Sequence, residues 1–190
     1  LVTALLSLPM SLRAEDLTVA DGTTTNDYLP TYGLYTDTQG MKGQCLYSSD
    51  LLGDMEGGQI SKLTFYLSSP AQVAWTGTFN VYLGATSKTD LSSSFESVSN
   101  LTLVYTGTLN ATGSTMEISL PTPYTYEGGN LLLDITVTQG GNYKSATFYG
   151  SSISGAGRYF NGSSYGSQTP QNFLPKTTFT YEPAATGTCP

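Results

Sequence analysis

Aromatic and amide side chains gather late in this sequence, in a stretch that also contains many Ser and Gly residues. Tyr and Trp offer flat apolar faces with a polar group at one end, which suits stacking on sugar rings while amides and hydroxyls bond the ring substituents. We therefore expect a glycan or peptide site within residues 142–173, formed by Tyr143, Tyr159, Asn161 and Tyr165. The alternative is local packing, because aromatic residues are enriched in strands and pair across them.

The single tryptophan adds one more candidate binding residue. Trp75 precedes Thr76-Gly77, a pair typical of a turn. Such a ring is either a surface platform for a ligand or a lid on the core, and the high average burial of tryptophan favours the lid.

The residue types that most enzymes need are scarce. The chain has no histidine in 190 residues, and only 11% of its residues are charged. The lack of histidine removes Ser-His-Asp and Cys-His nucleophile systems and typical zinc sites. A glycosidase needs only two carboxylates, and Asp134 stands in a strongly apolar run. It is either a functional carboxylate with a raised pKa or, as we favour, part of a solvated or hydrogen-bonded sheet face. We expect no catalytic residue and no cofactor.

Two groups of acidic residues are candidate calcium ligands, because Ca²⁺ prefers oxygen donors. The first comprises Asp50, Asp54 and Glu56. The second comprises Asp21, Asp27 and Asp37. Neither spacing matches an EF-hand. The favoured interpretation of both groups is a solvated acidic turn, so we expect no metal site.

Charge and the N-terminal segment indicate where the protein acts. The formal net charge is −7 and no Lys/Arg cluster is present, which argues against a nucleic-acid partner. Residues 1–16 combine an apolar run, Pro9 and a small residue at Ala14, a pattern typical of the remainder of a secretory signal peptide. The alternative is an ordinary apolar segment. No run approaches the roughly 18 apolar residues needed to span a bilayer. We expect a secreted or cell-surface protein.

The two cysteines do not form a disulfide framework. Cys45 lies in a strand-like run and Cys189 is the penultimate residue. We expect Cys45 to be buried as a small apolar residue rather than bridged to Cys189, because free cysteine is among the most buried residue types.

Short apolar runs with a period of two recur along the chain, whereas helical periodicity is almost absent. The predicted fold is an all-β, two-sheet antiparallel sandwich of jelly-roll type over residues 17–182, followed by a linker at 183–190 to a further domain. Leu131 to Thr138 is the expected central strand. Pro121 and Pro123 are expected to end a strand. A helical turn or two is expected at 49–55, capped by Ser48 or Ser49.

The order of several blocks resembles a β-sandwich domain found repeatedly in secreted and surface proteins of the Bacteroidetes. These blocks are Gln44-Cys45-Leu46-Tyr47 with Ser48 to Met55, Gly58-Gln59-Ile60 leading into Leu63-Thr64-Phe65-Tyr66, Val81 to Thr86, Leu103 to Gly107, Tyr124 to Val137 and Leu174 to Phe179. The resemblance implies an extracellular module within adhesins or multidomain enzymes, and it supplies no functional residues.

Together these patterns favour a non-catalytic extracellular module for adhesion or ligand binding within a larger surface protein, its partner a glycan or a host surface protein. The alternative is a purely structural spacer or an accessory domain of a secreted enzyme, in contact mainly with neighbouring domains of the same chain.

Overall fold

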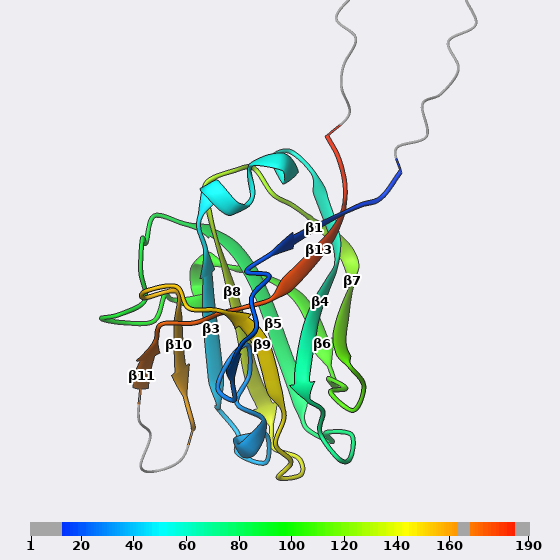
Figure 1. The fold of residues 1–190 in the computed structure, drawn as a ribbon, viewed down its shortest axis with the longest axis vertical. Helices are drawn as coiled ribbons and strands as arrows, with labels where there is room; N and C mark the ends of the chain where they lie inside the picture. The colour runs from blue at the N-terminus through cyan, green and yellow to red at the C-terminus, as the bar shows by residue number, and fades with distance from the viewer. Residues whose placement is uncertain (1–12, 163–167, 185–190) are drawn as a thin grey trace, which may run out of the picture.

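Two antiparallel β-sheets packed face to face make up the computed structural model, which describes residues 13–162 and 168–184 (Figure 1). The predicted all-β sandwich is confirmed, while its jelly-roll character stays a prediction. Tyr165, Cys189 and most of the expected signal segment and linker lie outside the described residues.

In the part of the chain that the structure describes, the first sheet has seven strands, and its longest members are β4 and β7. Its strands are β1 Glu15–Val19, β2 Thr24–Asn26, β4 Gln59–Ser69, β7 Thr115–Thr125, β9 Thr147–Ser151, β12 Leu174–Pro175 and β13 Thr177–Glu182. Strand β4 pairs with β7, β9 and β13. It therefore joins the parts of this sheet that come from distant regions of the chain.

The second sheet has six described strands, in the order β11-β10-β3-β8-β5-β6. Its strands are β3 Lys42–Tyr47, β5 Thr78–Thr86, β6 Thr102–Gly107, β8 Asn130–Gln139, β10 Gly157–Phe160 and β11 Gln168–Gln171. Strand β8 pairs with β3 on one side and β5 on the other, so the prediction of a central strand there is confirmed.

Four short 3₁₀ helices connect the strands over the described residues: η1 Gly33–Tyr35, η2 Ser49–Leu51, η3 Gly53–Met55 and η4 Val98–Asn100. The expected helical turn at 49–55 is therefore present, as η2 and η3. In place of the expected serine cap, the amide of Ser49 donates to Oδ1 of Asn130 (2.9 Å). Gly57, with φ of 77°, then redirects the chain toward β4.

The prediction that Pro121 and Pro123 end a strand is wrong. Strand β7 continues through both prolines to Thr125. It does so because its pairing with β4 shifts register in this part of the ladder, so the missing proline donors interrupt no regular pairing. Beside the prolines, β7 and β6 flank a groove of about 510 Å³ at one side of the sandwich.

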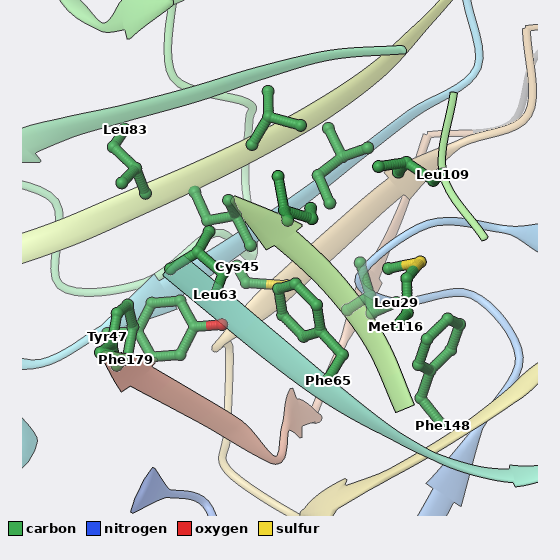
Figure 2. Packing of buried hydrophobic residues seen from close by; sticks show 14 of the residues in the cluster. Leu29, Cys45, Tyr47, Leu63, Phe65, Leu83, Leu109, Met116, Phe148 and Phe179 are labelled. Carbon is green, nitrogen blue, oxygen red and sulfur yellow. The ribbon is translucent and has the colours of Figure 1, made fainter. Parts of the chain in front are cut away.

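The core lies between the sheets, because each strand directs alternate side chains inward. Figure 2 shows side chains of both sheets in this layer, among them Phe65 of β4 and Cys45 of β3, both fully buried. The ring of Tyr47 meets that of Phe179 edge-on at 5.2 Å between centroids, and its hydroxyl bonds Oγ1 of Thr177 (2.8 Å). The inward residues of β8 are buried too: Leu131, Leu133, Ile135 and Val137.

A second apolar layer lies on the outer face of the six-stranded sheet. The connection between β5 and β6, residues 87–101, which we term the covering loop, places Leu91 against Leu46 and Leu132. Nη1 of Arg158 donates to the carbonyls of Leu91 (3.0 Å) and Ser92 (2.9 Å). This face is therefore shielded from solvent at the covering loop.

The first and last described strands are neighbours. Glu15 of β1 pairs with Tyr181 of β13, so the sheet begins two residues before the expected boundary at residue 17. Both ends of the described chain leave from the same end of the sandwich, at the top of Figure 1. Within the described residues, no helix is long and apolar enough to cross a membrane.

Candidate functional site

Five tyrosines from three separate segments meet at one end of the sandwich. Their rings form a connected set, which we term the tyrosine cluster. It consists of Tyr28, Tyr32 and Tyr35 from the connection between β2 and β3, Tyr143 from the connection between β8 and β9, and Tyr159 of β10. The helical turn η1 and the β8–β9 connection both lie at the bottom of Figure 1, opposite the chain ends.

Each ring of the cluster contacts at least one other ring of the cluster. Tyr28 stacks on Tyr159 with centroids 4.4 Å apart and planes 14° from parallel. Tyr32 meets Tyr28 at 4.6 Å and Tyr35 at 4.8 Å. Tyr35 meets Tyr143 edge-on at 6.1 Å. Offset and edge-to-face contacts at these separations are favourable, so the rings hold one another in place.

Side-chain hydrogen bonds fix the backbone beneath the cluster. Oδ1 of Asn26 accepts from the amides of Tyr28 (2.7 Å) and Leu29 (3.1 Å), a turn that asparagine forms readily. Oγ1 of Thr36 is 2.7 Å from the carbonyl of Asn142, to which it donates. The second bond ties the loop that carries Tyr28, Tyr32 and Tyr35 to the loop that carries Tyr143.

A glycine allows the loop to lie against the sheet. A Cβ on Gly43 would stand 2.3 Å from the carbonyl oxygen of Pro30, closer than side-chain carbons approach backbone. Gly43 is also the residue of β3 that pairs with Tyr159. The absence of a side chain at this position therefore lets the connection between β2 and β3, which carries Tyr28, Tyr32 and Tyr35 and which we term the tyrosine loop, pack next to Tyr159.

The cluster presents aromatic surface to solvent. Tyr143 is 54% exposed, and the other four rings are half-buried. The pKa of Tyr32 is raised to about 12, first by burial and then by the neighbouring tyrosines Tyr28, Tyr35, Tyr159 and Tyr143, because each disfavours a phenolate there. The cluster can thus offer apolar ring faces beside hydroxyl groups, the combination that suits a ligand with C–H faces and hydroxyls.

The raised pKa of Tyr32 predicts a contribution to pH-dependent stability. The folded protein holds this proton up to about pH 12, whereas the unfolded chain releases it near the ordinary value of 10.0. The contribution of neutral Tyr32 is therefore complete below pH 10 and is lost as the pH rises toward 12. We expect Tyr32→Phe to reduce the fall in unfolding free energy over this interval, measured by urea denaturation at a series of pH values.

Other tyrosines serve as the internal reference for this comparison. The pKa values of Tyr124 and Tyr181 are also raised, chiefly by burial, and their contributions are common to the wild type and the variant. If the unfolding free energies of the two proteins depend on pH in the same way, the pKa of Tyr32 is not raised by the fold.

The structure brings together two of the five predicted binding residues. Tyr143 and Tyr159 both belong to the tyrosine cluster, and Asn161 is half-buried two residues beyond Tyr159. Tyr165 lies outside the described residues. Trp75 is only 2% exposed, and its Nε1 donates to the carbonyl of Lys144 (2.9 Å), so it closes the core and offers no platform to a ligand.

Three members of the cluster were missed at the level of the sequence. Tyr28, Tyr32 and Tyr35 precede the late aromatic stretch by more than a hundred residues. Their signal is the density of tyrosine in a short segment that also contains Pro30 and Gly33. Pattern alone does not connect them to Tyr159, because that contact depends on the pairing of β3 with β10.

Asp134 lies on a hydrogen-bonded sheet face, as favoured from the sequence. It is fully buried beneath the covering loop and accepts from Nε2 of Gln44 (2.8 Å) and Oγ1 of Thr136 (2.6 Å). Nζ of Lys42 is 3.5 Å from its Oδ2. These contacts hold the carboxylate in a structural hydrogen-bond network.

Asp21 and Asp27, two of the candidate calcium ligands, have separate partners. Asp21 pairs with Lys176, whereas Asp27 accepts from Oγ1 of Thr147 (2.5 Å). Over residues 13–162 and 168–184, no three His, Cys, Asp or Glu side chains come close enough to hold a metal ion.

Cys45 is confirmed as a buried apolar residue. It is a free thiol with no exposed surface in the part of the chain that the structure describes. Burial, and to a lesser degree the charge of Asp134, raise the pKa of this thiol. A buried, protonated thiol is chemically inert, which assigns Cys45 to the core.

Comparisons with known proteins leave the family open. No protein-family model matches the sequence, and no curated protein matches it significantly. The resemblance to Bacteroidetes surface domains therefore stays a prediction.

Proposed function

We propose that the chain is a non-catalytic extracellular β-sandwich module that binds a glycan through the tyrosine cluster. The observation that carries this proposal is the set of five contacting rings, of which Tyr143 is 54% exposed. Tyrosine has few rotatable bonds and combines an apolar face with a hydroxyl, so it loses little entropy when it contacts a sugar ring.

The position of the cluster supports a role in binding over one as a spacer. β1 and β13 are paired, so segments that precede Glu15 and follow Glu182 would attach at one end of the sandwich. The cluster lies at the other end. Such a module projects its tyrosines away from its attachment point and adds little length between neighbouring domains. A spacer, in contrast, must hold its neighbouring domains apart.

The available side chains support a non-catalytic role. The chain has no histidine, and the carboxylate most deeply embedded in a strand, Asp134, is held by Gln44, Thr136 and Lys42. The tyrosine cluster itself offers phenol side chains, which bind and orient a ligand but are poor general bases at neutral pH.

Substitution of Tyr143 tests the proposal. We expect Tyr143→Ala to weaken glycan binding by about tenfold and Tyr143→Phe to weaken it less, because phenylalanine keeps the stacking face. Tyr159→Ala is expected to act similarly by removing the support of Tyr28. Glycan-array screening of the full chain, followed by calorimetry with the glycan that binds, measures the effect.

Tyr82→Ala is the matched control, because Tyr82 is half-buried on β5 and outside the cluster. It should leave glycan binding unchanged. Equal binding by wild type and Tyr143→Ala would contradict the proposed site. Binding of surface proteins in place of glycans, with the same dependence on Tyr143, would retain the site and overturn the glycan assignment.

A further inference from the structure

A further pocket shares no residue with the tyrosine cluster. It has a volume of about 300 Å³ and is lined mainly by polar and aromatic groups. The polar and aromatic residues that line it are Asp21, Thr23, Tyr66, Ser114, Tyr149 and Lys176. A volume of this size is at the lower end of the range for small-molecule sites.

The two aromatic residues of this pocket point outward from the seven-stranded sheet. Tyr66 follows Phe65 on β4 and Tyr149 follows Phe148 on β9, and both phenylalanines are fully buried. Because successive side chains of a strand point to opposite faces, the two tyrosines lie on the outer face. Both are half-buried, so each retains accessible surface.

A compensated ion pair provides the charged groups of the pocket. Nζ of Lys176 pairs with Oδ1 of Asp21 and lies 4.6 Å from the centroid of the Tyr66 ring. The Asp21 side chain is 64% exposed and that of Lys176 is 24% exposed. An ionised carboxylate has about four acceptor positions and an ammonium has three donors, so both groups keep hydrogen-bonding capacity after pairing.

The backbone holds these groups in position. The amide of Lys176 donates to the carbonyl of Tyr149 (2.8 Å). The amide of Leu67 donates to the carbonyl of Ser114 (2.9 Å). A Cβ on Gly22 would lie 2.6 Å from the carbonyl oxygen of Gly150, so only glycine lets the turn that carries Asp21 pack this closely against β9.

We infer that this pocket binds one neutral sugar residue. This inference is independent of the glycan binding proposed for the tyrosine cluster. The opposite charges of Asp21 and Lys176 compensate each other, which favours a neutral ligand over an anion or a cation. The carboxylate, the ammonium and the hydroxyls of Thr23 and Ser114 complement sugar hydroxyls. Tyr149 supplies a ring for the C–H face of the sugar.

The test is an NMR titration of the full chain with glucose, galactose, mannose and N-acetylglucosamine as separate probes. We expect at least one of them to shift the amide signals of Gly22, Ser114 and Lys176. Asp21→Ala and Lys176→Met should each weaken that binding by about tenfold or more, the loss typical of a hydrogen bond to a charged group. N-acetylneuraminic acid and glucosamine serve as the anionic and cationic comparisons.

Two control variants separate this inference from its alternatives. Lys62→Met removes the lysine that pairs with Glu117 (3.7 Å) on the same sheet, outside the pocket, and should leave the shifts unchanged. Tyr143→Ala should also leave them unchanged, even if it abolishes glycan binding at the tyrosine cluster. Absence of shifts with all four neutral sugars, insensitivity to Asp21→Ala, or stronger binding of a charged sugar would overturn the inference.

Discussion

Replacing Phe65 by alanine is expected to lower the free energy of unfolding by about 4 kcal/mol, the middle of the range for a fully buried phenylalanine. Phe65 has no exposed surface, and it lies on β4, which pairs with three other strands of its sheet. Its removal leaves a cavity between the sheets that the paired backbones cannot close (Figure 2).

Urea denaturation followed by circular dichroism measures this loss, and thermal unfolding should shift down by roughly 10 °C for a protein of this size. Phe65→Leu is the matched control and should cost about 1 kcal/mol, because it keeps most of the apolar volume. A loss below 1 kcal/mol for the alanine variant would show that Phe65 is not at the centre of the core.

Replacing Asp134 by alanine is expected to cost about 3 kcal/mol and to release the covering loop. Its carboxylate accepts from Gln44 and Thr136 and lies beside Lys42. The amide group of Gln44 in turn bonds both backbone groups of Glu96, donating to its carbonyl (2.9 Å) and accepting from its N–H (2.9 Å). Loss of Asp134 leaves buried donors without their acceptor and frees Gln44 to move.

Two measurements separate the parts of this prediction. Urea denaturation gives the loss of stability, and amide hydrogen exchange at Glu96 should accelerate more than exchange at Phe65. Glu117→Ala is the control, because its exposed ion pair with Lys62 should contribute less than about 1 kcal/mol. Unchanged exchange at Glu96 in the Asp134 variant would mean that the covering loop is held by other contacts.

Much of the fold follows from local pattern. Alternation along 131–138 correctly predicts a central strand, because both ladders of β8 require uninterrupted backbone donors and its inner face requires aliphatic side chains. The rule that proline ends strands failed at Pro121 and Pro123, because that rule assumes a regular ladder and this part of β7 has a register shift. Local pattern thus predicts strands better than it predicts their irregularities.

The candidate site was only half predictable, since it depends on contacts between distant segments. Tyr143 and Tyr159 stood out by their surroundings, whereas their partners in the tyrosine loop are placed by Asn26, Gly43 and the pairing of β3 with β10. The covering loop is hard to predict for a similar reason. Its polar sequence resembles an exposed connection, and only the side chain of Leu91 reaches the sheet face as a fully buried residue.

The pairing of β1 with β13 has a mechanical consequence. These antiparallel neighbours have Glu15 opposite Tyr181 and Val19 opposite Thr177, so a force that separates the two ends would act across the ladder and not along it. Ladder hydrogen bonds lie perpendicular to antiparallel strands, so such a force loads them one pair at a time, from Glu15 inward. Under tension, β1 would therefore unzip from β13 at a lower force than simultaneous shearing of the same hydrogen bonds would need.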